Sequence, residues 1–475
     1  MRPTLLSQIS NPLVNVLANI YRGSLLTLVC ALLASGCAVI DPHNIIGRIH
    51  VPPPLADTPV PNVGGDAWKQ AALDYVWNTV NEKYYDAKLN GVDWRAVRTK
   101  YEPMLKQSKT DDEYWELLDK MAGELRDSHT RVQSPKQVAQ QRMNESHSLG
   151  FTFLEQDGAL LLVGVNPDSD AYWAGVRAGM TVKTISNEPA LKLYQRLLLE
   201  VRDSSTGWAR SRGAVRKISA GEIDTKVDIT FARLDGTEIS ATIKRRAFKI
   251  PPEFTQRVLP SGFGYISFSN FVGGLEGNIL RAIDKMKSTP GMIIDLRNNG
   301  GGSLSMTGNL LTKFLSDKTK GTKVLTRTGK APTLFFIETI SLDPELKGTK
   351  ETAYTNPVVI LTNQNSASAS EVFASTLQDL GRATVIGART CGCLLGYMGY
   401  ADIPGGGQLA YSEMGFVSPK GKRVEGEGVT PDIEVKLTQA DIAAYRDRGL
   451  EAAVDFLQQK TATTKSLASV TESSK

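Results

Sequence analysis

Two stretches of the sequence place small and polar residues where an apolar strand-like run gives way to a helix-like one. The first, residues 295–302, reads Asp-Leu-Arg-Asn-Asn-Gly-Gly-Gly. Consecutive glycines let backbone N–H groups approach a ligand closely, and a helix N-terminus adds positive potential. The stretch lacks the Lys-Ser/Thr pair of a P-loop and the spacing of a dinucleotide fingerprint. It therefore indicates an oxyanion hole, with a plain tight turn as the alternative.

The second stretch, residues 363–371, reads Asn-Gln-Asn-Ser-Ala-Ser-Ala-Ser-Glu and follows the apolar run 358–362. A serine at the start of a helix lies at the positive end of the helix dipole, which suits a nucleophile whose tetrahedral intermediate is anionic. Ser368 and Glu371 equally spell a helix capping box, and most such serines only cap helices. This stretch alone leaves both interpretations open.

Together the two stretches resemble the C-terminal-processing peptidases, also called tail-specific proteases, whose wider family includes the tricorn core protease and the retinoid-binding repeats of photoreceptors. The resemblance extends to the run Gly-Val-Thr-Pro-Asp at 428–432. It implies that Ser368 is the nucleophile and that the backbone N–H groups of Ala369 and Gly301 are the oxyanion donors. It also implies an α/β core of the ClpP/crotonase type and hydrolysis of unfolded or tail-exposed proteins, with no metal and no organic cofactor.

The general base departs from the tail-specific pattern. In that branch a lysine lies 25 residues after the serine and a glutamine follows four residues later, whereas this sequence has Cys393 and Tyr397 at those positions. The Ser/Lys dyad is therefore absent. A hydrolase would need another base for Ser368, and histidine is the commonest.

Only one of the four histidines stands in a compact motif. His129 lies in Asp-Ser-His-Thr at 127–130, which resembles the base motif of the tricorn-like branch. That branch adds a glutamate three residues before the Gly-Val-x-Pro-Asp run, here Glu425. The resemblance implies that His129 takes the Ser368 proton while Ser128 and Glu425 orient the imidazole and stabilise its charged form.

Other assignments remain open for the base. His129 could be a structural histidine at a domain junction, in which case Lys420 and Lys422 are the next candidates. An imidazole with an ordinary pKa predicts activity that falls as the pH drops through about 6 to 7, whereas a lysine base predicts a limb above about pH 8.

Composition sets the class of protein. The chain has 475 residues, which predicts about three domains, and 41% hydrophobic with 22% charged residues is typical of folded proteins. The net charge of +5 comes with no basic block, which argues against a nucleic-acid binder.

The N-terminus has the composition of an export signal. Arg2 and Arg22 precede an apolar run at 25–34, and Ala-Ser-Gly-Cys follows at 34–37. The pattern resembles a bacterial lipobox, which implies a signal peptide at 1–36 and lipidation of Cys37. A plain signal or an uncleaved anchor is the alternative. Because Ala38 is not aspartate, resemblance to lipoproteins implies the periplasmic face of the outer membrane. The proline-rich residues 37–65 predict an extended tether.

Two further segments precede the core. Residues 66–145 carry apolar positions at helical spacing, behind Asp66 and behind a capping box at Thr110, and predict a helical domain. Residues 148–250 read as short β runs. Within them Leu149-Gly150-Phe151 and the run 174–180 resemble the carboxylate-binding loop and following turn of a PDZ domain, which captures peptides at a sheet edge. An unrelated small β domain is the alternative.

Residues 255–440 alternate between strand and helix patterns, which predicts parallel strands in an α/β core. The expected strands are 264–268, 292–296, 358–362 and 383–387, and the expected helices are 275–287, 304–315 and 368–380. Within 441–475 we expect a last helix and a disordered Thr/Ser/Lys tail.

The fold class is therefore multidomain α/β, and the function expected is that of a lipid-anchored serine endopeptidase of the cell envelope. Its partners would be polypeptide substrates and, through the anchor, a membrane. A non-catalytic PDZ adaptor and an apolar-ligand-binding relative are the alternatives. Cys391 and Cys393 are too few for a zinc site, and a disulfide between cysteines two apart is disfavoured, so we expect structural or incidental roles for them.

Overall fold

The structure is a computed structural model that describes residues 67–143, 145–334 and 337–473, with side chains through residue 463. Cys37, the signal and the tether at 37–65 lie outside the described residues. Contacts divide the chain into two units, and residues 330–341, with the hairpin of β15 (Thr333–Leu334) and β16 (Ile337–Glu338), belong to the smaller one. The larger unit comprises residues 57–329 and 342–475.

The first part of this unit is helical, as the sequence predicts. α3 (Ala67–Lys83) and α5 (Asp111–Gly123) are the two expected helices, and Thr110 caps α5 by accepting a hydrogen bond from Glu113 N. Between them lie the short 3₁₀ helix η1 (Leu89–Gly91) and α4 (Trp94–Lys106), which the sequence reading did not single out. The three long helices enclose an aromatic-rich core that includes Tyr84, Trp94 and Tyr114.

A small sheet joins this helical part to the C-terminal half of the chain. β1 (Arg131–Gln133) pairs antiparallel with β22 (Gly407–Ala410), which pairs in turn with β21 (Ala401–Ile403). α6 (Pro135–Arg142) follows β1, with Ser134 completing a capping box. The segment just before β1 is thus held between parts of the chain that are far apart in sequence.

Residues 145–249 form a β domain that also contains helices. Its main sheet has the order β3 (Phe151–Gln156), β4 (Ala159–Val165), β5 (Thr181–Ile185), β7 (Lys226–Ala232) and β8 (Glu238–Lys244), with β6 (Glu188–Pro189) paired to β5. β2 (Glu145–Ser148) pairs with β9 (Arg246–Lys249). The sequence pattern predicts only strands and turns in this segment. The structure adds α7 (Asp170–Trp173), α8 (Ala190–Glu200) and α9 (Gly207–Ser219), the last capped by Thr206.

The core is a six-stranded sheet in the order β10 (Phe254–Val258), β11 (Gly264–Phe268), β12 (Met292–Asp295), β18 (Val358–Thr362), β19 (Ala383–Gly387) and β24 (Ile433–Glu434). All neighbours are parallel except β10 and β11. This confirms the predicted strands and their direction. Parallel strands of this kind are buried on both faces, which is why they read as continuous apolar runs.

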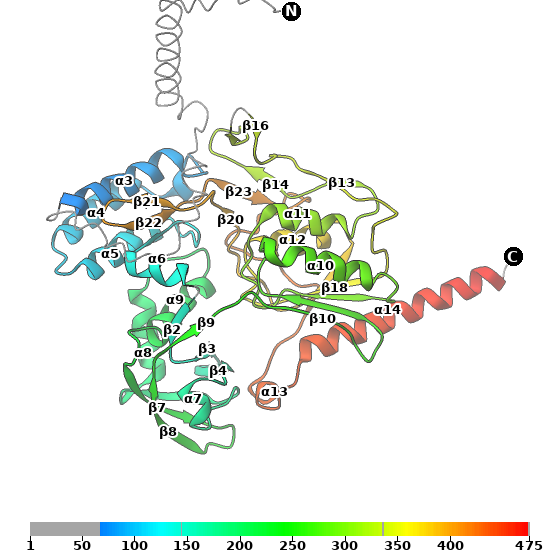
Figure 1. Cartoon of the computed structure of the whole chain (residues 1–475), viewed down its shortest axis with the longest axis horizontal. Coiled ribbons are helices and arrows are strands. Elements are labelled where there is room, and N and C mark those ends of the chain that lie inside the picture. Colours follow the sequence, from blue (N-terminus) through cyan, green and yellow to red (C-terminus); the bar gives the residue numbers. More distant parts are fainter. Residues whose placement is uncertain (1–66, 144, 335–336, 474–475) are drawn as a thin grey trace, which may run out of the picture. The chain divides into compact units, whose positions relative to one another are not determined.

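Helices cover both faces of the core sheet (Figure 1). α10 (Gly273–Lys285), α11 (Leu304–Thr312) and α12 (Ala369–Asp379) match the predicted helices to within a few residues. On the other face, Ala453 and Leu457 of α14 (Arg448–Ser473) pack against Ile293, Val359 and Ile386. Shorter strands complete the core: β13 (Lys318–Lys320) with β17 (Glu345–Lys347), and β14 (Lys323–Leu325), β23 (Met414–Val417) and β20 (Leu395–Gly396).

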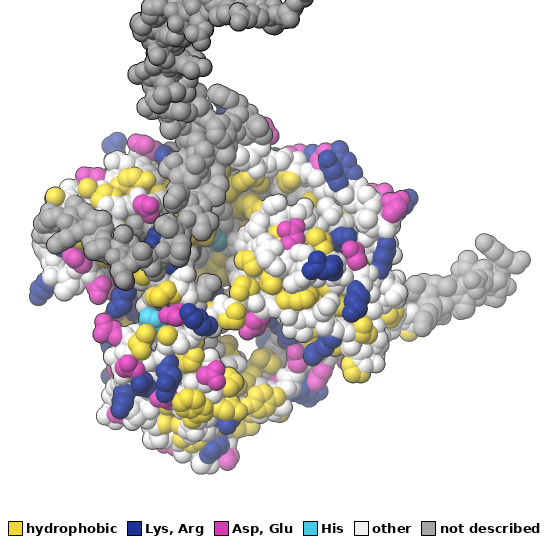
Figure 2. All heavy atoms as spheres, in the orientation of Figure 1, with side chains coloured by type: hydrophobic (Ala, Val, Ile, Leu, Met, Phe, Trp, Pro, Cys, Tyr) yellow, Lys and Arg dark blue, Asp and Glu magenta, His cyan; other side chains and the backbone are white. Residues whose placement is uncertain are grey.

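The C-terminal segment corrects one expectation. The residues predicted to be a disordered tail continue α14 to Ser473. No glycine or proline follows Gly449, so nothing in the sequence stops the helix once it has formed. No helix among the described residues is long and apolar enough to cross a membrane. On the face shown in Figure 2, cationic and anionic side chains are interspersed, in keeping with the small net charge.

Candidate active site

Ser368 occupies a sharp turn between the end of β18 and the start of α12. Its backbone has φ 57° and ψ −118°, a left-handed conformation that non-glycine residues rarely adopt outside functional or strained sites. The turn presents the hydroxyl at the N-terminal end of α12, where the helix dipole favours negative charge. This is the strand, turn and helix arrangement that the sequence predicts for a nucleophile.

The two motifs at 295–302 and 363–371 are bonded to each other. Asn298 N donates to Asn363 Oδ1 at 3.0 Å, and Ala367 N donates to Asn299 O at 3.0 Å. Ser370 Oγ donates to Asn299 Oδ1 at 2.8 Å. The glycine-rich turn is therefore fixed against the turn that carries Ser368.

Gly301 makes the closest approach between the two turns. A Cβ at this position would lie 2.7 Å from Ser368 Cβ and 2.6 Å from Ala367 O, so only glycine fits. Its N–H, however, donates to Asn299 Oδ1 at 2.9 Å. A side-chain acceptor therefore already engages the N–H that the resemblance assigns to the oxyanion hole. Ala369 N lies 2.8 Å from the same Cβ position, which places the second predicted donor beside Gly301.

His129 is brought to Ser368 from the helical part of the chain. Its Nε2 lies 3.3 Å from Ser368 Oγ, although the two residues are 239 positions apart. The backbone N–H of His129 donates to Asp127 Oδ1 at 2.7 Å, and the buried carboxylate of Asp127 also accepts a hydrogen bond from Ser412 Oγ at 2.6 Å. These bonds fix the loop between α5 and β1 that carries the imidazole.

The imidazole is neutral at neutral pH. Burial lowers the pKa of His129 to about 4, and this effect outweighs the attraction of the Asp127 carboxylate for the imidazolium. A neutral imidazole can accept a proton through Nε2 when Nδ1 carries the hydrogen. Nδ1 is buried and has no hydrogen-bond partner among the described residues.

Glu425 lies on the chain segment that follows β23 and is buried. Its Oε2 accepts a hydrogen bond from Leu394 N at 2.5 Å, whereas Oε1 is buried with no partner in the described part of the chain. Burial, reinforced by the Asp127 carboxylate, raises the pKa of Glu425 to about 8. No hydrogen bond joins Glu425 to His129 in this structure, so the predicted orienting contact is not made directly.

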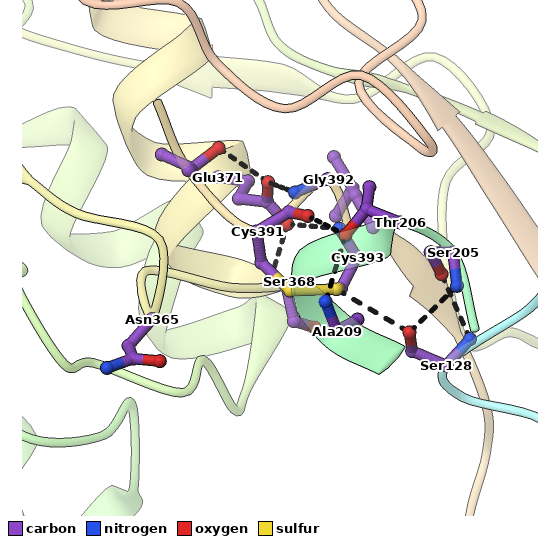
Figure 3. Close-up of a disulfide and its surroundings, with 12 residues drawn as sticks. Ser128, Ser205, Thr206, Ala209, Asn365, Ser368, Glu371, Cys391, Gly392 and Cys393 are labelled. Atoms are coloured by element: carbon purple, nitrogen blue, oxygen red, sulfur yellow. Dashed lines mark hydrogen bonds between the residues drawn. A yellow bond between two sulfur atoms is a disulfide. The ribbon is translucent and has the colours of Figure 1, made fainter. Parts of the chain in front are cut away.

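The Ser128 side chain makes no hydrogen bond to the imidazole in this structure either. Its Oγ accepts a hydrogen bond from Ser205 N at 3.2 Å and donates to Cys393 Sγ at 3.5 Å (Figure 3). A second hydrogen bond runs in the opposite direction, from Ser128 N to Ser205 Oγ, at 2.9 Å. The Ser205 side chain also lowers the pKa of the Glu425 carboxyl against the effect of burial. The sequence reading missed Ser205, and the only local signal is that it precedes the helix cap Thr206.

The Glu371 side chain holds the turn that carries Ser368. The side chain is fully buried, and its carboxylate accepts hydrogen bonds from Ser368 N at 2.9 Å, Thr390 Oγ1 at 2.6 Å, Gly392 N at 2.7 Å and Cys393 N at 3.0 Å. Burial raises the pKa of Glu371 to about 7 although these four donors lower it. Glu371 therefore caps the start of α12, as the sequence predicts, and Ser368 keeps its position as the predicted nucleophile.

Cys391 and Cys393 form a disulfide, contrary to the expectation that cysteines two apart would stay unpaired. Their Cα atoms are 5.2 Å apart, within the usual range, because Gly392 turns the chain with φ +68°. Cys393 O accepts a hydrogen bond from Ser368 N at 3.1 Å. Trp208 and Ala209 of α9 pack against both cysteines and Ala367. The disulfide therefore lies directly behind the nucleophile turn, at the position where the tail-specific branch has its lysine.

The two lysines that are alternative bases are both bonded to Asp379. Lys422 Nζ is paired with Asp379 at 3.3 Å, and Lys420 donates its backbone N–H to the same carboxylate. The loop Leu149-Gly150-Phe151 joins β2 to β3, and Leu149 N donates to Ser219 O at the end of α9 at 3.2 Å. The described residues contain no group of three or more His, Cys, Asp or Glu side chains able to hold a metal ion.

Comparison with known proteins agrees with this geometry. Residues 262–435 match the model of peptidase family S41, and residues 66–123 match the C1 domain of the tricorn protease. The S41 match covers the α/β core of the chain. It is 25% identical over 405 residues to a carboxyl-terminal-processing protease of Synechocystis, with 82% of this chain and 87% of the relative covered. The S41 match and this relative identify the chain as a serine-type peptidase, a hydrolase of peptide bonds.

Two solved structures resemble this chain in fold. The photosystem II D1 C-terminal processing protease matches with a TM-score of 0.52 and 22% identity, covering 78% of this chain and 93% of that one. Mature CPAF in complex with lactacystin matches with a TM-score of 0.62 and 16% identity, covering 83% and 98%. At these identities the likeness concerns the arrangement of the elements.

Proposed function

We propose that this peptidase cleaves polypeptides near their carboxyl termini through Ser368, His129 and Glu425. The distance of 3.3 Å between His129 Nε2 and Ser368 Oγ carries the proposal, because it is the contact through which a base activates a serine. The printed name of the Synechocystis relative supports processing at the carboxyl terminus. It also supports hydrolysis over the alternatives of a PDZ adaptor or an apolar-ligand binder.

In the proposed reaction His129 Nε2 takes the Ser368 proton as Oγ attacks the scissile carbonyl carbon. The C–N bond then breaks, the imidazolium gives its proton to the leaving amine, and water hydrolyses the acyl-enzyme with His129 again as base. The oxyanion forms beside Ala369 N–H and the Gly301 turn, at the N-terminus of α12. Release of Gly301 N–H from Asn299 Oδ1 would complete the oxyanion hole.

Glu425 is proposed to stabilise the imidazolium. When Nε2 accepts the Ser368 proton, Nδ1 of His129 carries a hydrogen that has no acceptor, and Oε1 of Glu425 is a buried acceptor that has no donor. These atoms complement each other, and we propose that they are joined, directly or through one water, once substrate is bound. Ser128 and Ser205 then act as positioning residues, because their reciprocal bonds connect the His129 loop to the segment ahead of α9.

The β domain at 145–249 is proposed to be a PDZ domain whose Leu149-Gly150-Phe151 loop holds the substrate. The order of β2, that loop, β3 and the later helix α8 supports this assignment. We further propose a lipid anchor at Cys37 on the periplasmic face of the outer membrane, on the strength of the lipobox-like run at 34–37.

A fluorophosphonate probe tests the catalytic proposal. The folded wild type should become covalently labelled at Ser368 and should hydrolyse an unstructured protein, whereas S368A should do neither. H129A should lose at least about 10³-fold in kcat, as expected for removal of one member of a Ser-His system. The matched control is H147A, because His147 in β2 bonds only to Gln140 and Glu145. Hydrolysis by folded H129A at the wild-type rate would overturn the assignment of the base.

A further inference from the structure

α9 connects the catalytic centre to the predicted peptide loop. At its start, Thr206 Oγ1 donates to Cys391 O at 2.8 Å, and Ala209 lies against the disulfide behind Ser368 (Figure 3). At its end, Ser219 O accepts the hydrogen bond from Leu149 N. The helix has 13 residues, so it is about 20 Å long, the length of about six residues of extended peptide.

One face of this helix carries two arginines without partners. Arg212 and Arg216 are four residues apart and follow Trp208 at the same spacing, so all three share a face. Both arginines are exposed to solvent, and neither makes a hydrogen bond or ion pair with any described residue. Their neighbours differ in this respect, since Arg210 pairs with Asp203 and Lys217 pairs with Glu116.

A third arginine extends the positive charge to the imidazole. Arg131, two residues after His129, donates to the hydroxyl of Tyr400 and lies 5.6 Å from the ring centroid of Tyr397. The Tyr397 ring centroid is in turn 6.0 Å from that of His129. Arg131 thus has aromatic and hydroxyl partners, and no carboxylate lies within ion-pair distance of it among the described side chains.

Neighbouring protein groups affect the pKa of both arginines on α9. Burial lowers the pKa of Arg216, which Asp119 raises and Arg131 and Arg202 lower further. Asp119 is paired with Arg202 at 3.0 Å, and no ion pair joins it to Arg216 among the described side chains. Burial likewise lowers the pKa of Arg212. Protein groups near both guanidinium groups therefore replace part of the water that would otherwise screen their charge.

We propose that Arg216 and Arg212, together with Arg131 beside the imidazole, form a cationic track that selects substrates with Asp or Glu between the scissile bond and the carboxyl terminus. The inference rests on the proposed function, since it assumes that the terminus is held at the Leu149 loop and cleaved at Ser368. An extended substrate along α9 would place about six residues over the track. Acidic side chains there would pair with arginines that have no carboxylate partner among the described residues.

The test compares peptide substrates that differ only in charge. Quenched fluorescent peptides share one scissile sequence and carry Asp/Glu, the isosteric Asn/Gln, or Lys at the third and fifth residues after it. Wild type should show kcat/KM about tenfold higher for the acidic peptide than for the amide peptide, and the difference should shrink at high ionic strength. Equal values would overturn the proposal.

Charge reversal on the helix gives the second arm of the test. R212E/R216E should lose the acidic preference and favour the Lys peptide. The matched control K192E/R281E makes the same change in net charge at two exposed positions, on α8 and α10, and should retain the wild-type preference. If R212E/R216E does not fold, R212Q/R216Q should abolish the preference without reversing it. An acidic preference that survives in either folded variant would overturn the track.

The result separates the two proposals. Hydrolysis of all three peptides at one rate, with Ser368 labelled by fluorophosphonate, would leave the proposed function intact and reject the track. No labelling of Ser368 and no hydrolysis of any peptide would reject the proposed function itself.

Discussion

Glu371 and Ser368 are joined by two hydrogen bonds, one in each direction. Ser368 N donates to Glu371 Oε2 at 2.9 Å, and Glu371 N donates to Ser368 O at 2.8 Å. The same carboxylate holds Gly392 N and Cys393 N, so the nucleophile turn and the disulfide turn depend on one buried side chain. Stability and catalysis are therefore expected to change together when this side chain is altered.

Replacing Glu371 by alanine should lower both. Four buried donors would lose their acceptor, and a bond to a charged group contributes about 1.5–3 kcal/mol, so we expect a loss of at least about 3 kcal/mol in the free energy of unfolding. The kcat should fall about 100-fold because Ser368 is no longer held in its strained conformation. Urea denaturation and peptide hydrolysis measure the two effects. E82A on α3 removes an exposed carboxylate and should change neither. A kcat for E371A within twofold of wild type would contradict the positioning role.

The pH dependence should differ from that of an ordinary imidazole. Because the pKa of His129 is lowered to about 4, the imidazole stays neutral and able to accept a proton well below pH 6. Because the pKa of Glu425 is raised to about 8, its carboxylate forms, and can stabilise the imidazolium, only as the pH rises through that value. As the pH increases, kcat/KM should therefore rise in two steps. The first step, near pH 4, accompanies deprotonation of His129, and the second, near pH 8, accompanies deprotonation of Glu425.

The variant E425Q separates these two limbs. It should lose the limb near pH 8, retain the limb near pH 4, and have a reduced plateau. A single limb at 6 to 7 in both proteins, as an ordinary histidine would give, would show that neither pKa shift governs the reaction.

Ser205 should contribute to catalysis although it is remote in sequence from every motif. We expect S205A to lose about tenfold in kcat with little change in melting temperature, because the bonded pair of Ser205 and Ser128 positions the His129 loop. The double variant S128A/S205A should be little worse than either single variant, as residues in one network are not additive. S204A is the control, and additive losses would indicate independent roles.

Removing the disulfide should affect activity more than stability. The bond closes a very short loop, so the double variant C391A/C393A should lose about 2 kcal/mol or less in the free energy of unfolding. Activity should fall several-fold, because the disulfide holds the turn whose carbonyl, Cys393 O, accepts the Ser368 N–H, and because Cys393 Sγ, which accepts the Ser128 hydroxyl, is removed. Alkylation and mass spectrometry establish the redox state of the wild type. Free thiols in protein from an oxidising compartment would contradict the pairing.

The anchor prediction concerns Cys37. C37S should hydrolyse soluble peptides at the wild-type rate and leave the outer-membrane fraction or remain unprocessed, because a lipidated cysteine holds a protein at a bilayer through its buried acyl chains. Membrane fractionation and the mass of the mature N-terminus measure this. Processing and fractionation of C37S like those of wild type would reject the lipobox interpretation.

Sequence reasoning succeeded where local pattern and burial agree. The strands Gly264–Phe268, Val358–Thr362 and Ala383–Gly387 have the predicted bounds because each is an apolar run in a doubly covered sheet. The pairing of His129 with Ser368 was accessible only through resemblance, since no periodic pattern connects residues so far apart.

Other features depend on contacts that sequence does not encode locally. The helices α8 and α9 lie between strands of the β domain, whose pattern dominates this part of the sequence. Ser205 acquires its predicted role only through the hydrogen bond with Ser128 that folding creates. The hydrogen bond from Gly301 to Asn299 and the disulfide turn at Gly392 both depend on backbone conformations with positive φ. Glycine permits such conformations without requiring them.

The pairing of β1 with β22 implies that the proposed base is positioned late in synthesis. Arg131, two residues after His129, lies opposite Ala410, so the strand that positions the histidine has no partner until that part of the chain has been made. Ser368 is synthesised before β22, and Glu425 after it. A nascent or prematurely terminated copy therefore carries the nucleophile without a positioned base. Such copies should be harmless to neighbouring unfolded chains, and hydrolysis should begin only on completed molecules.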